Sequence, residues 1–427
     1  MRESSTRREF LLATGTVAAL AGCSERLPLS DDAPEQIPLH QLPDVPDEGA
    51  SRPIVSRDIP VDIERERLVQ AATRVTDLLE TLPIPFGPAD VPNGYVRHEL
   101  IEAAETATEH LDEARSANTR LAALQSLHHA RTEARYAAEG WAFVERGRTK
   151  ADLQVKHRET VAEAEAFQSR YEYLGDDPVR AVVVHAHLRQ DLQRVLDTSD
   201  PFTYRDPSAL LTVGEWGERA EAARTYLADS RYLYDQFASS LPSTVGTVES
   251  ILDAAAESLT ADLRRRRDEL PPEPTEMDDE LAGRIRSRLR HNADSTARNL
   301  PAGGPARTIL FAVEGLAQFL AHDRIQSRIE DGERFRAETG ADVRKARSEA
   351  LEAVREALEE SPRPELTRGV LADVARLVMY ADDELARYRT SVRPGRLNHP
   401  VRRYVTATAQ ARSVPTARQT VIEALEP

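Results

Sequence analysis

Residues 136–142 read Tyr-Ala-Ala-Glu-Gly-Trp-Ala, and residues 311–317 read Phe-Ala-Val-Glu-Gly-Leu-Ala. Each stretch lies in a long run of helix-forming residues and follows two other amphipathic segments. A glycine inside a helix costs about 1 kcal/mol relative to alanine. The recurrence of Gly140 and Gly315 in matched context therefore predicts a close approach between helices at both places. The two halves of the chain are either related by duplication, or alike by chance because both consist of alanine-rich amphipathic helices.

Apolar residues at helical spacing continue outward from these stretches over most of the chain. Proline and glycine clusters, such as 271–274 and 303–305, separate the periodic segments, and no segment has the pattern of a convincing strand. We therefore predict an all-α protein whose helical hairpins pack as bundles or as a short α-solenoid, in two halves, 61–241 and 242–427. Helices are expected at residues 62–82, 96–117, 119–146, 150–174, from 178 onward, 213–241, 245–267, 278–299, 305–339, 341–359, 364–388, 401–412 and 416–425. If the halves are related, the first three helices correspond to those at 245–267, 278–299 and 305–322.

The composition is acidic and almost free of lysine. The chain has 72 Asp and Glu against 56 Lys and Arg, a net charge of −16 at pH 7, and its lysines are Lys150, Lys156 and Lys345. This balance argues against a nucleic-acid partner, because such binding depends on neutralising phosphates with basic side chains. Acid excess with little lysine resembles the proteins of halophilic archaea; a GC-rich genome that encodes arginine in place of lysine is the alternative.

The first 23 residues carry two sorting motifs. Residues 6–11 (Thr-Arg-Arg-Glu-Phe-Leu) open a short apolar run, and residues 20–23 (Leu-Ala-Gly-Cys) close it. The run is shorter than the roughly 20 apolar residues that span a bilayer, which favours an export signal over a transmembrane helix. The first motif resembles the twin-arginine export signal, through Arg7 and Arg8, and the second resembles a lipobox. Together they resemble the N-terminus of bacterial and archaeal lipoproteins.

This resemblance implies that residues 1–22 are a signal peptide and that Cys23 becomes the lipidated first residue of the mature chain. It places the protein on the extracytoplasmic face of the cell membrane, held through two acyl chains, which anchor stably where one is marginal. Cys23 is the only cysteine, so a disulfide within the chain is impossible and a catalytic thiol is not expected. An uncleaved hydrophobic N-terminus with a chance cysteine is the alternative.

Residues 23–60 are predicted to be a tether. Seven prolines lie between Ser24 and Pro60, and this segment has no apolar period. Each proline removes a backbone donor and restricts the preceding residue, so regular structure is not expected. The tether would hold the helical part away from the membrane; the alternative is that part of it packs across the domain.

Sequence motifs for catalysis are mostly absent. There is no G-x-G-x-x-G, G-x-S-x-G or phosphate-binding loop, and His98-Glu99 begins an H-E-x-x-H pattern in which Glu102 replaces the second histidine. His187 and Asp191 lie at i, i+4 on one helical face, and imidazole and carboxylate groups suit metal ions, so this pair is the candidate metal site. A surface contact between the two side chains is the alternative.

Two arginine-rich segments are expected to form solvated ion pairs and not a docking patch. Residues 264–267 are four consecutive arginines with acids beside them, and the arginines at 284, 286, 288 and 290 follow the same pattern.

The functional prediction is a non-catalytic binding or scaffold lipoprotein with a protein or peptide partner at the cell surface, because paired helices present grooves for such partners. No cofactor and no catalytic residue are predicted, and the partners are the membrane, through Cys23, and a polypeptide. The alternative is a small-molecule or metal receptor, that is, a solute-binding lipoprotein; an enzyme ranks third.

Overall fold

A computed structural model describes residues 36–197, 208–272, 281–300 and 303–426. Over these residues it contains thirteen α-helices, a short 3-10 helix at Leu39–Gln41 and no β-strand, which confirms the all-α prediction. The first six helices are α1 (Arg65–Leu79), α2 (Gly94–Arg115), α3 (Arg120–Arg146), α4 (Lys150–Gln168), α5 (Pro178–Leu196) and α6 (Ala209–Ser239). The other seven are α7 (Glu249–Asp268), α8 (Leu281–Arg298), α9 (Pro305–Glu330), α10 (Gly340–Glu359), α11 (Pro364–Ala386), α12 (Pro394–Ala411) and α13 (Val414–Leu425).

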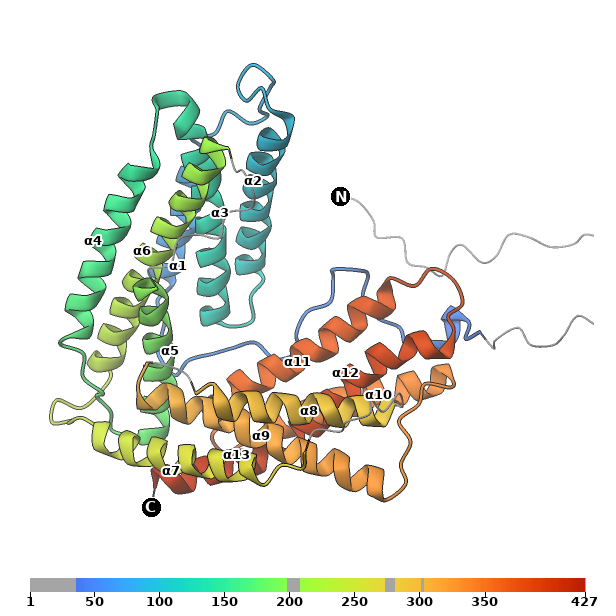
Figure 1. Cartoon of the computed structure of the whole chain (residues 1–427). Helices are drawn as coiled ribbons and strands as arrows, with labels where there is room; N and C mark the ends of the chain where they lie inside the picture. Colours follow the sequence, from blue (N-terminus) through green and yellow to red (C-terminus); the bar gives the residue numbers. More distant parts are fainter. Residues whose placement is uncertain (1–35, 198–207, 273–280, 301–302, 427) are drawn as a thin grey trace, which may run out of the picture.

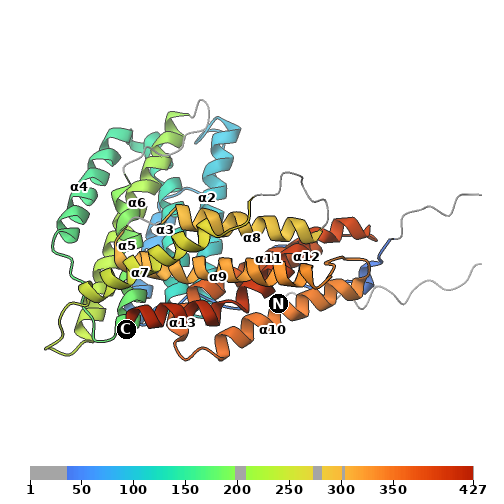
Figure 2. The same cartoon turned by 60° about the horizontal axis from the view of Figure 1, so that its bottom comes forward.

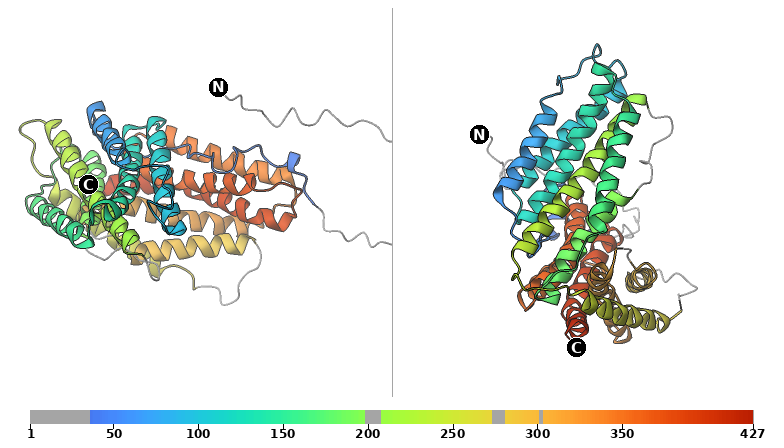
Figure 3. Two further views of the ribbon diagram at one scale, coloured as in Figure 1. Left: turned by 90° about the horizontal axis from the view of Figure 1, so that it is seen from above. Right: turned by 90° about the vertical axis from the view of Figure 1, so that its left-hand side faces the viewer.

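Helices α1–α6 form one bundle and α7–α13 form a second, and the two meet at a corner to give an L-shaped molecule (Figure 1). We call these bundles the first half and the second half. Two other directions show the same arrangement, with the helices of the second half running away from the first (Figure 2, Figure 3). Helix α5 joins the halves, because it packs on α6 of its own bundle and on α9 of the other.

The first half is built around α3, which contacts α1, α2 and α6. Ala130 and Ala134 of α3 are completely buried, and such small side chains let the neighbouring helices come close. Thr119 accepts a hydrogen bond from a first-turn amide and so caps the start of the helix. Gly147 ends it in the left-handed conformation, with φ of 66°.

The second half repeats this order of contacts. Helix α9 packs against α7 and α8 as α3 packs against α1 and α2, and α12 packs against α10 and α11 as α6 packs against α4 and α5. The signals that start the helices recur too. Capping boxes open α4 at Thr149 and α10 at Thr339, and Pro178 and Pro364 occupy the first turns of α5 and α11. The chain therefore consists of two related helical halves, with α13 added to the second.

The two recurring glycines lie where helices approach closely. A Cβ atom on Gly140 of α3 would stand 2.6 Å from Leu100 Cδ2 of α2, and one on Gly315 of α9 would stand 3.0 Å from Thr296 Cγ2 of α8. These neighbours come from the corresponding helices of the two halves. The second neighbours differ, since Gly140 also faces α6 and Gly315 also faces α7.

Gly140→Leu and Gly315→Leu are each expected to lower the free energy of unfolding by about 1–3 kcal/mol, because the added atoms overpack the helix contact. The loss at Gly140 should be the larger, since its nearest neighbour is closer. Gly369→Leu is the control, because nothing lies within 4 Å of a Cβ built at that position. Urea denaturation measures the three values, and a loss at Gly369 equal to that at Gly140 would contradict this explanation.

The tether prediction is wrong for residues 36–60, where the alternative holds. Ile37 and Val55 are buried, and Ile37 pairs with Val392 in an isolated antiparallel bridge. The segment runs across both halves: the Arg57 carbonyl accepts a hydrogen bond from Thr119 Oγ1 at 2.6 Å, and other backbone atoms accept from arginines of α5, α10 and α11. The prolines limit regular structure here to the short 3-10 helix and the isolated bridge, but they do not prevent burial of the apolar side chains between them. The remainder of the predicted tether, residues 23–35, lies outside the described residues.

Three helix boundaries differ from the predictions by six residues or more. Helix α4 ends at Gln168 and not at residue 174, and α9 ends at Glu330 and not at residue 339. Gly332 follows α9 with φ of 83°, a conformation that ends the helix. Helix α12 begins at Pro394, seven residues earlier than expected, because a proline is well suited to the first helical position.

None of the described helices combines the length and the apolarity needed to cross a lipid bilayer.

Candidate functional site

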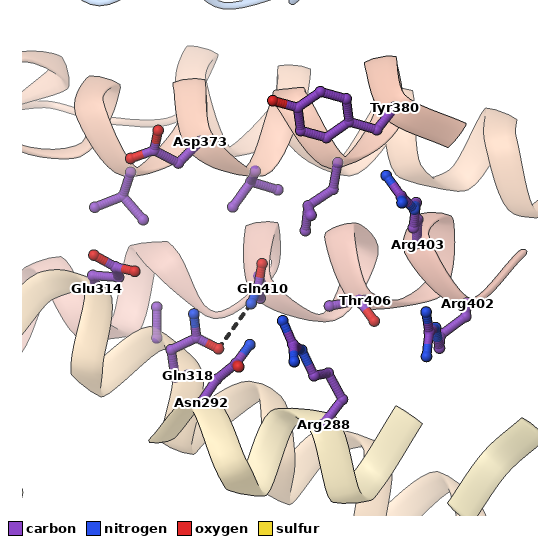
Figure 4. Close-up of a pocket in the computed structure, with 14 residues that line it drawn as sticks. Arg288, Asn292, Glu314, Gln318, Asp373, Tyr380, Arg402, Arg403, Thr406 and Gln410 are labelled. Carbon is purple, nitrogen blue, oxygen red and sulfur yellow. Dashed lines mark hydrogen bonds between the residues drawn. The ribbon is translucent and has the colours of Figure 1, made fainter. Parts of the chain in front are cut away.

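A charged groove of about 640 Å³ lies between α8, α9, α11 and α12 of the second half (Figure 4). We call it the charged groove. Helix α8 supplies Arg288 and Asn292, α9 supplies Glu314, Ala317 and Gln318, α11 supplies Val370, Asp373, Val374, Leu377 and Tyr380, and α12 supplies Arg402, Arg403, Thr406 and Gln410. The apolar residues of α11 form one wall, and charged groups stand at both ends.

Three arginines line one side of the groove: Arg402 and Arg403 lie at its end, and Arg288 lies between this end and the middle (Figure 4). We call this region the arginine end. Burial lowers the pKa of Arg402, and the charges of Arg403, Arg288 and Arg284 lower it further. Arg403 stacks over the ring of Tyr380, 5.6 Å from its centroid. The arginine end is therefore a concentration of positive charge in a strongly acidic chain.

The arginine end has few carboxylates nearby to neutralise it. Glu384 is the nearest, with Oε2 4.0 Å from Arg403 Nε, and that same oxygen is hydrogen-bonded to His399 Nδ1 at 2.5 Å. Within the described part of the chain, no carboxylate forms an ion pair with Arg288 or Arg402. Helix α12 itself contains no Asp or Glu. These guanidinium groups consequently repel one another with little internal compensation.

The opposite end of the groove is acidic. Burial raises the pKa of Glu314, the charge of Asp373 raises it further, and Arg57 opposes them. Asp373 already accepts hydrogen bonds from Arg57 Nη2, at 2.6 Å, and from Arg376. Glu314 is thus the carboxylate at this end that has no ion pair among the described residues.

The middle of the groove is lined by a polar pair and an apolar wall. Gln410 Nε2 donates to Gln318 Oε1 at 2.8 Å, which joins α12 to α9 below the groove (Figure 4). Val374 and Leu377 of α11 face the groove from the other side. The arrangement suits an elongated ligand that has an apolar side and a negatively charged end.

A second, smaller cavity of about 260 Å³ lies where the halves meet, lined by α3, α5 and α6 together with Arg57 and Arg376. We call it the junction cavity. The structure places His187 and Asp191 here, with His187 Nε2 3.5 Å from Asp191 Oδ2. Asp191 also accepts a hydrogen bond from Arg194 at 3.0 Å. Burial raises the pKa of Asp191, whereas His187 and Arg194 lower it.

The candidate metal pair gains no further ligand from its surroundings. Across the described residues, no group of three or more His, Cys, Asp or Glu side chains is placed to hold a metal ion. His187 Nε2 lies 3.5 Å from Asp191, and the same carboxylate accepts a hydrogen bond from Arg194. Cys23, Arg7 and Arg8, the other predicted functional residues, lie outside the described residues.

The junction cavity contains a polar atom that the protein leaves unsatisfied. His128 is 7 % exposed, and its Nδ1 has no hydrogen-bond partner. Burial lowers its pKa to about 3, with further lowering by His129 and Arg131, so the ring is neutral at physiological pH. It packs against Tyr226, with ring centroids 4.0 Å apart.

The sequence prediction missed the charged groove and treated Arg288 as one of several solvated ion-paired arginines. A signal was present in α12, where Arg396, Arg402 and Arg403 occur in an 18-residue helix without any acid. In a chain with a net charge of −16, such a helix is exceptional.

Two family models match the chain, one for each half. Residues 66–244 match a domain of unknown function (DUF8262), and residues 249–423 match a second domain of unknown function (DUF8264). Each half is similar to its own family. No curated protein matches the chain, and no solved structure matches it. The gap between the two matches falls between α6 and α7, so the charged groove belongs wholly to the DUF8264 match, whereas the junction cavity is lined mainly by the DUF8262 match.

Proposed function

We propose that this protein is a lipid-anchored binding protein on the extracytoplasmic face of the cell membrane, and that its charged groove holds a segment of a protein or peptide partner. Export and anchoring rest on the motifs at Arg7-Arg8 and Cys23. The acid excess fits a salt-rich surrounding, in which ions screen the repulsion between carboxylates. Binding rests on the groove.

The observation that carries the binding function is the open groove, in which part of the apolar wall is exposed and charged groups near both ends have no ion pair among the described residues. Tyr380 is 47 % exposed and Leu377 is partly exposed, although both belong to a helix that is otherwise well buried. Apolar side chains beside charged groups in a concave site are typical of ligand sites. An extended polypeptide segment would cover this wall and leave its own backbone partly solvated.

Photo-crosslinking in intact cells tests this function. A benzophenone amino acid at position 380 is expected to capture a discrete polypeptide, because this side chain lies on the groove. The same substitution at Tyr95, which is 65 % exposed in the first half, is the matched control. The adduct should also disappear when Leu377→Arg is combined with the probe at position 380. Equal capture from positions 95 and 380, or capture that Leu377→Arg leaves unchanged, would contradict a groove-specific partner.

The second candidate function is a small-molecule or metal receptor, which the junction cavity favours. His128 and His187 both line this cavity, and the buried Nδ1 of His128 has no hydrogen-bond partner in the protein. A soluble ligand that raises the melting temperature of the native protein, but not of His187→Ala, would support this function over the first.

A further inference from the structure

We infer that the arginine end of the charged groove binds the free C-terminal carboxylate of a peptide whose last residues are apolar. This inference rests on the proposed function, because it names the group by which the groove would select its partner.

The positive charge at the arginine end favours binding of an anion. Arg288 of α8 and Arg402 of α12 line the same concave site, and Arg403 adds a third guanidinium group. Each of the other two is close enough for its charge to act on Arg402, and like charges destabilise each other unless an opposite charge stands between them. Glu384 is the nearest internal acid, and it is shared between Arg403 and His399. Guanidinium groups bind carboxylates through pairs of hydrogen bonds, so a ligand carboxylate is well suited to this place.

The groove beside the arginine end selects an apolar neighbour for that carboxylate. Leu377 and Tyr380 of α11 line the groove, and Tyr380 lies at the arginine end beside Arg403 (Figure 4). Thr406 supplies a hydroxyl on the facing helix α12. A free phosphate or sulfate ion would satisfy the arginines but would leave the apolar wall in water. A peptide terminus satisfies both, because its last side chains lie next to its carboxylate.

The opposite end of the groove favours a polypeptide with a cationic group farther from its terminus. Glu314 is without an ion pair there, and Arg57 and Arg376 already neutralise Asp373. An ammonium group of the ligand would pair with Glu314, and the volume of about 640 Å³ is enough for a few residues between the two charged ends. Acid at one end and base at the other also set the direction in which the peptide lies.

The test compares two synthetic peptides of sequence Lys-Ala-Val-Ala-Leu, one with a free carboxylate and one with an amidated C-terminus. Calorimetric titration of the full chain at one fixed salt concentration measures both dissociation constants, since salt screens these charges. The free acid is expected to bind at least tenfold more tightly than the amide. Arg288→Gln with Arg402→Gln should abolish this difference. Arg396→Gln is the matched control, because Arg396 lies on the same helix, is exposed and does not line the groove.

The outcomes separate this inference from the function on which it rests. Equal binding of the acid and the amide would overturn carboxylate recognition and leave the groove as a peptide site. Failure of both peptides to bind, together with failure of the crosslinking at position 380, would overturn the groove itself. Inorganic phosphate that displaces the free-acid peptide at equal concentration would show that the arginine end takes a free oxyanion, and it would overturn the peptide assignment. Loss of the acid preference in Arg396→Gln would show a general effect of charge and would do the same.

Discussion

Replacing Glu221 by alanine is expected to lower the free energy of unfolding by about 3–5 kcal/mol, because it leaves the buried guanidinium group of Arg131 without its counter-charge. Glu221 of α6 is 4 % exposed. Its Oε1 accepts hydrogen bonds from Arg131 Nη2 at 2.7 Å and Arg224 Nη2 at 3.0 Å, and its Oε2 accepts from Arg74 Nη2 at 3.4 Å. A single carboxylate therefore ties α1 and α3 to α6.

Glu163→Ala is the control for this substitution. Glu163 pairs with Arg231 at 2.9 Å, but its side chain is 59 % exposed, and such surface pairs contribute roughly 0–1 kcal/mol. Urea denaturation at pH 7 compares the two variants. If Glu221→Ala loses no more stability than Glu163→Ala, the buried network does not hold the first half together.

The same carboxylate predicts a pH dependence. Burial alone raises the pKa of Glu221, but Arg131 and Arg224 outweigh this effect and lower the pKa to about 2. The folded pKa lies below the ordinary value of 4.5, so the unfolded chain takes up the proton first as the pH falls. The stabilisation by Glu221 is thus complete above about pH 4.5 and is lost between about pH 4.5 and 2. Glu221→Gln should unfold with a shallower pH dependence than the native protein in this range.

Cys23→Ser is expected to move the protein from the membrane fraction to the soluble fraction. The lipobox-like residues 20–23 imply a lipid on the Cys23 sulfur, and serine offers no thiol for it. Two acyl chains together bury enough CH₂ groups, at about 0.8 kcal/mol each, for stable anchoring. Fractionation of cells followed by immunoblotting measures the distribution.

Ser24→Ala is the matched control for anchoring, because it changes the neighbouring residue and leaves the thiol in place. The double substitution Arg7→Lys and Arg8→Lys should keep the precursor inside the cell, since the receptor recognises the arginine pair. A Cys23→Ser protein that still sediments with membranes would exclude lipid anchoring at this residue, whatever happens to export.

Much of the secondary structure follows from local patterns along the chain. The helices at α4, α5, α10 and α11 begin where a Thr-x-x-Asp box or an Asp-Pro or Arg-Pro step predicts a start, because these signals act on backbone groups within one turn. Recurrence of glycine also predicted the close contacts at Gly140 and Gly315. The predicted ends of helices were less accurate than their starts, as α9 shows. A helix can end early where tertiary contacts bury the following apolar residues in a non-helical conformation.

Sequence patterns alone predicted an all-α chain in two halves with a strongly acidic charge, and they left open whether the two halves have the same order of helices. These properties depend on residue types and on spacing within a few turns. Only the tertiary structure decided that residues 36–60 pack across both halves, and that Glu314, Asp373 and Arg402 line one groove. Prolines define what a segment cannot form, but not what it packs against. The groove depends on how α8, α9, α11 and α12 pack around a common core, and that packing is set by apolar burial summed over the whole half, which no single stretch of sequence records.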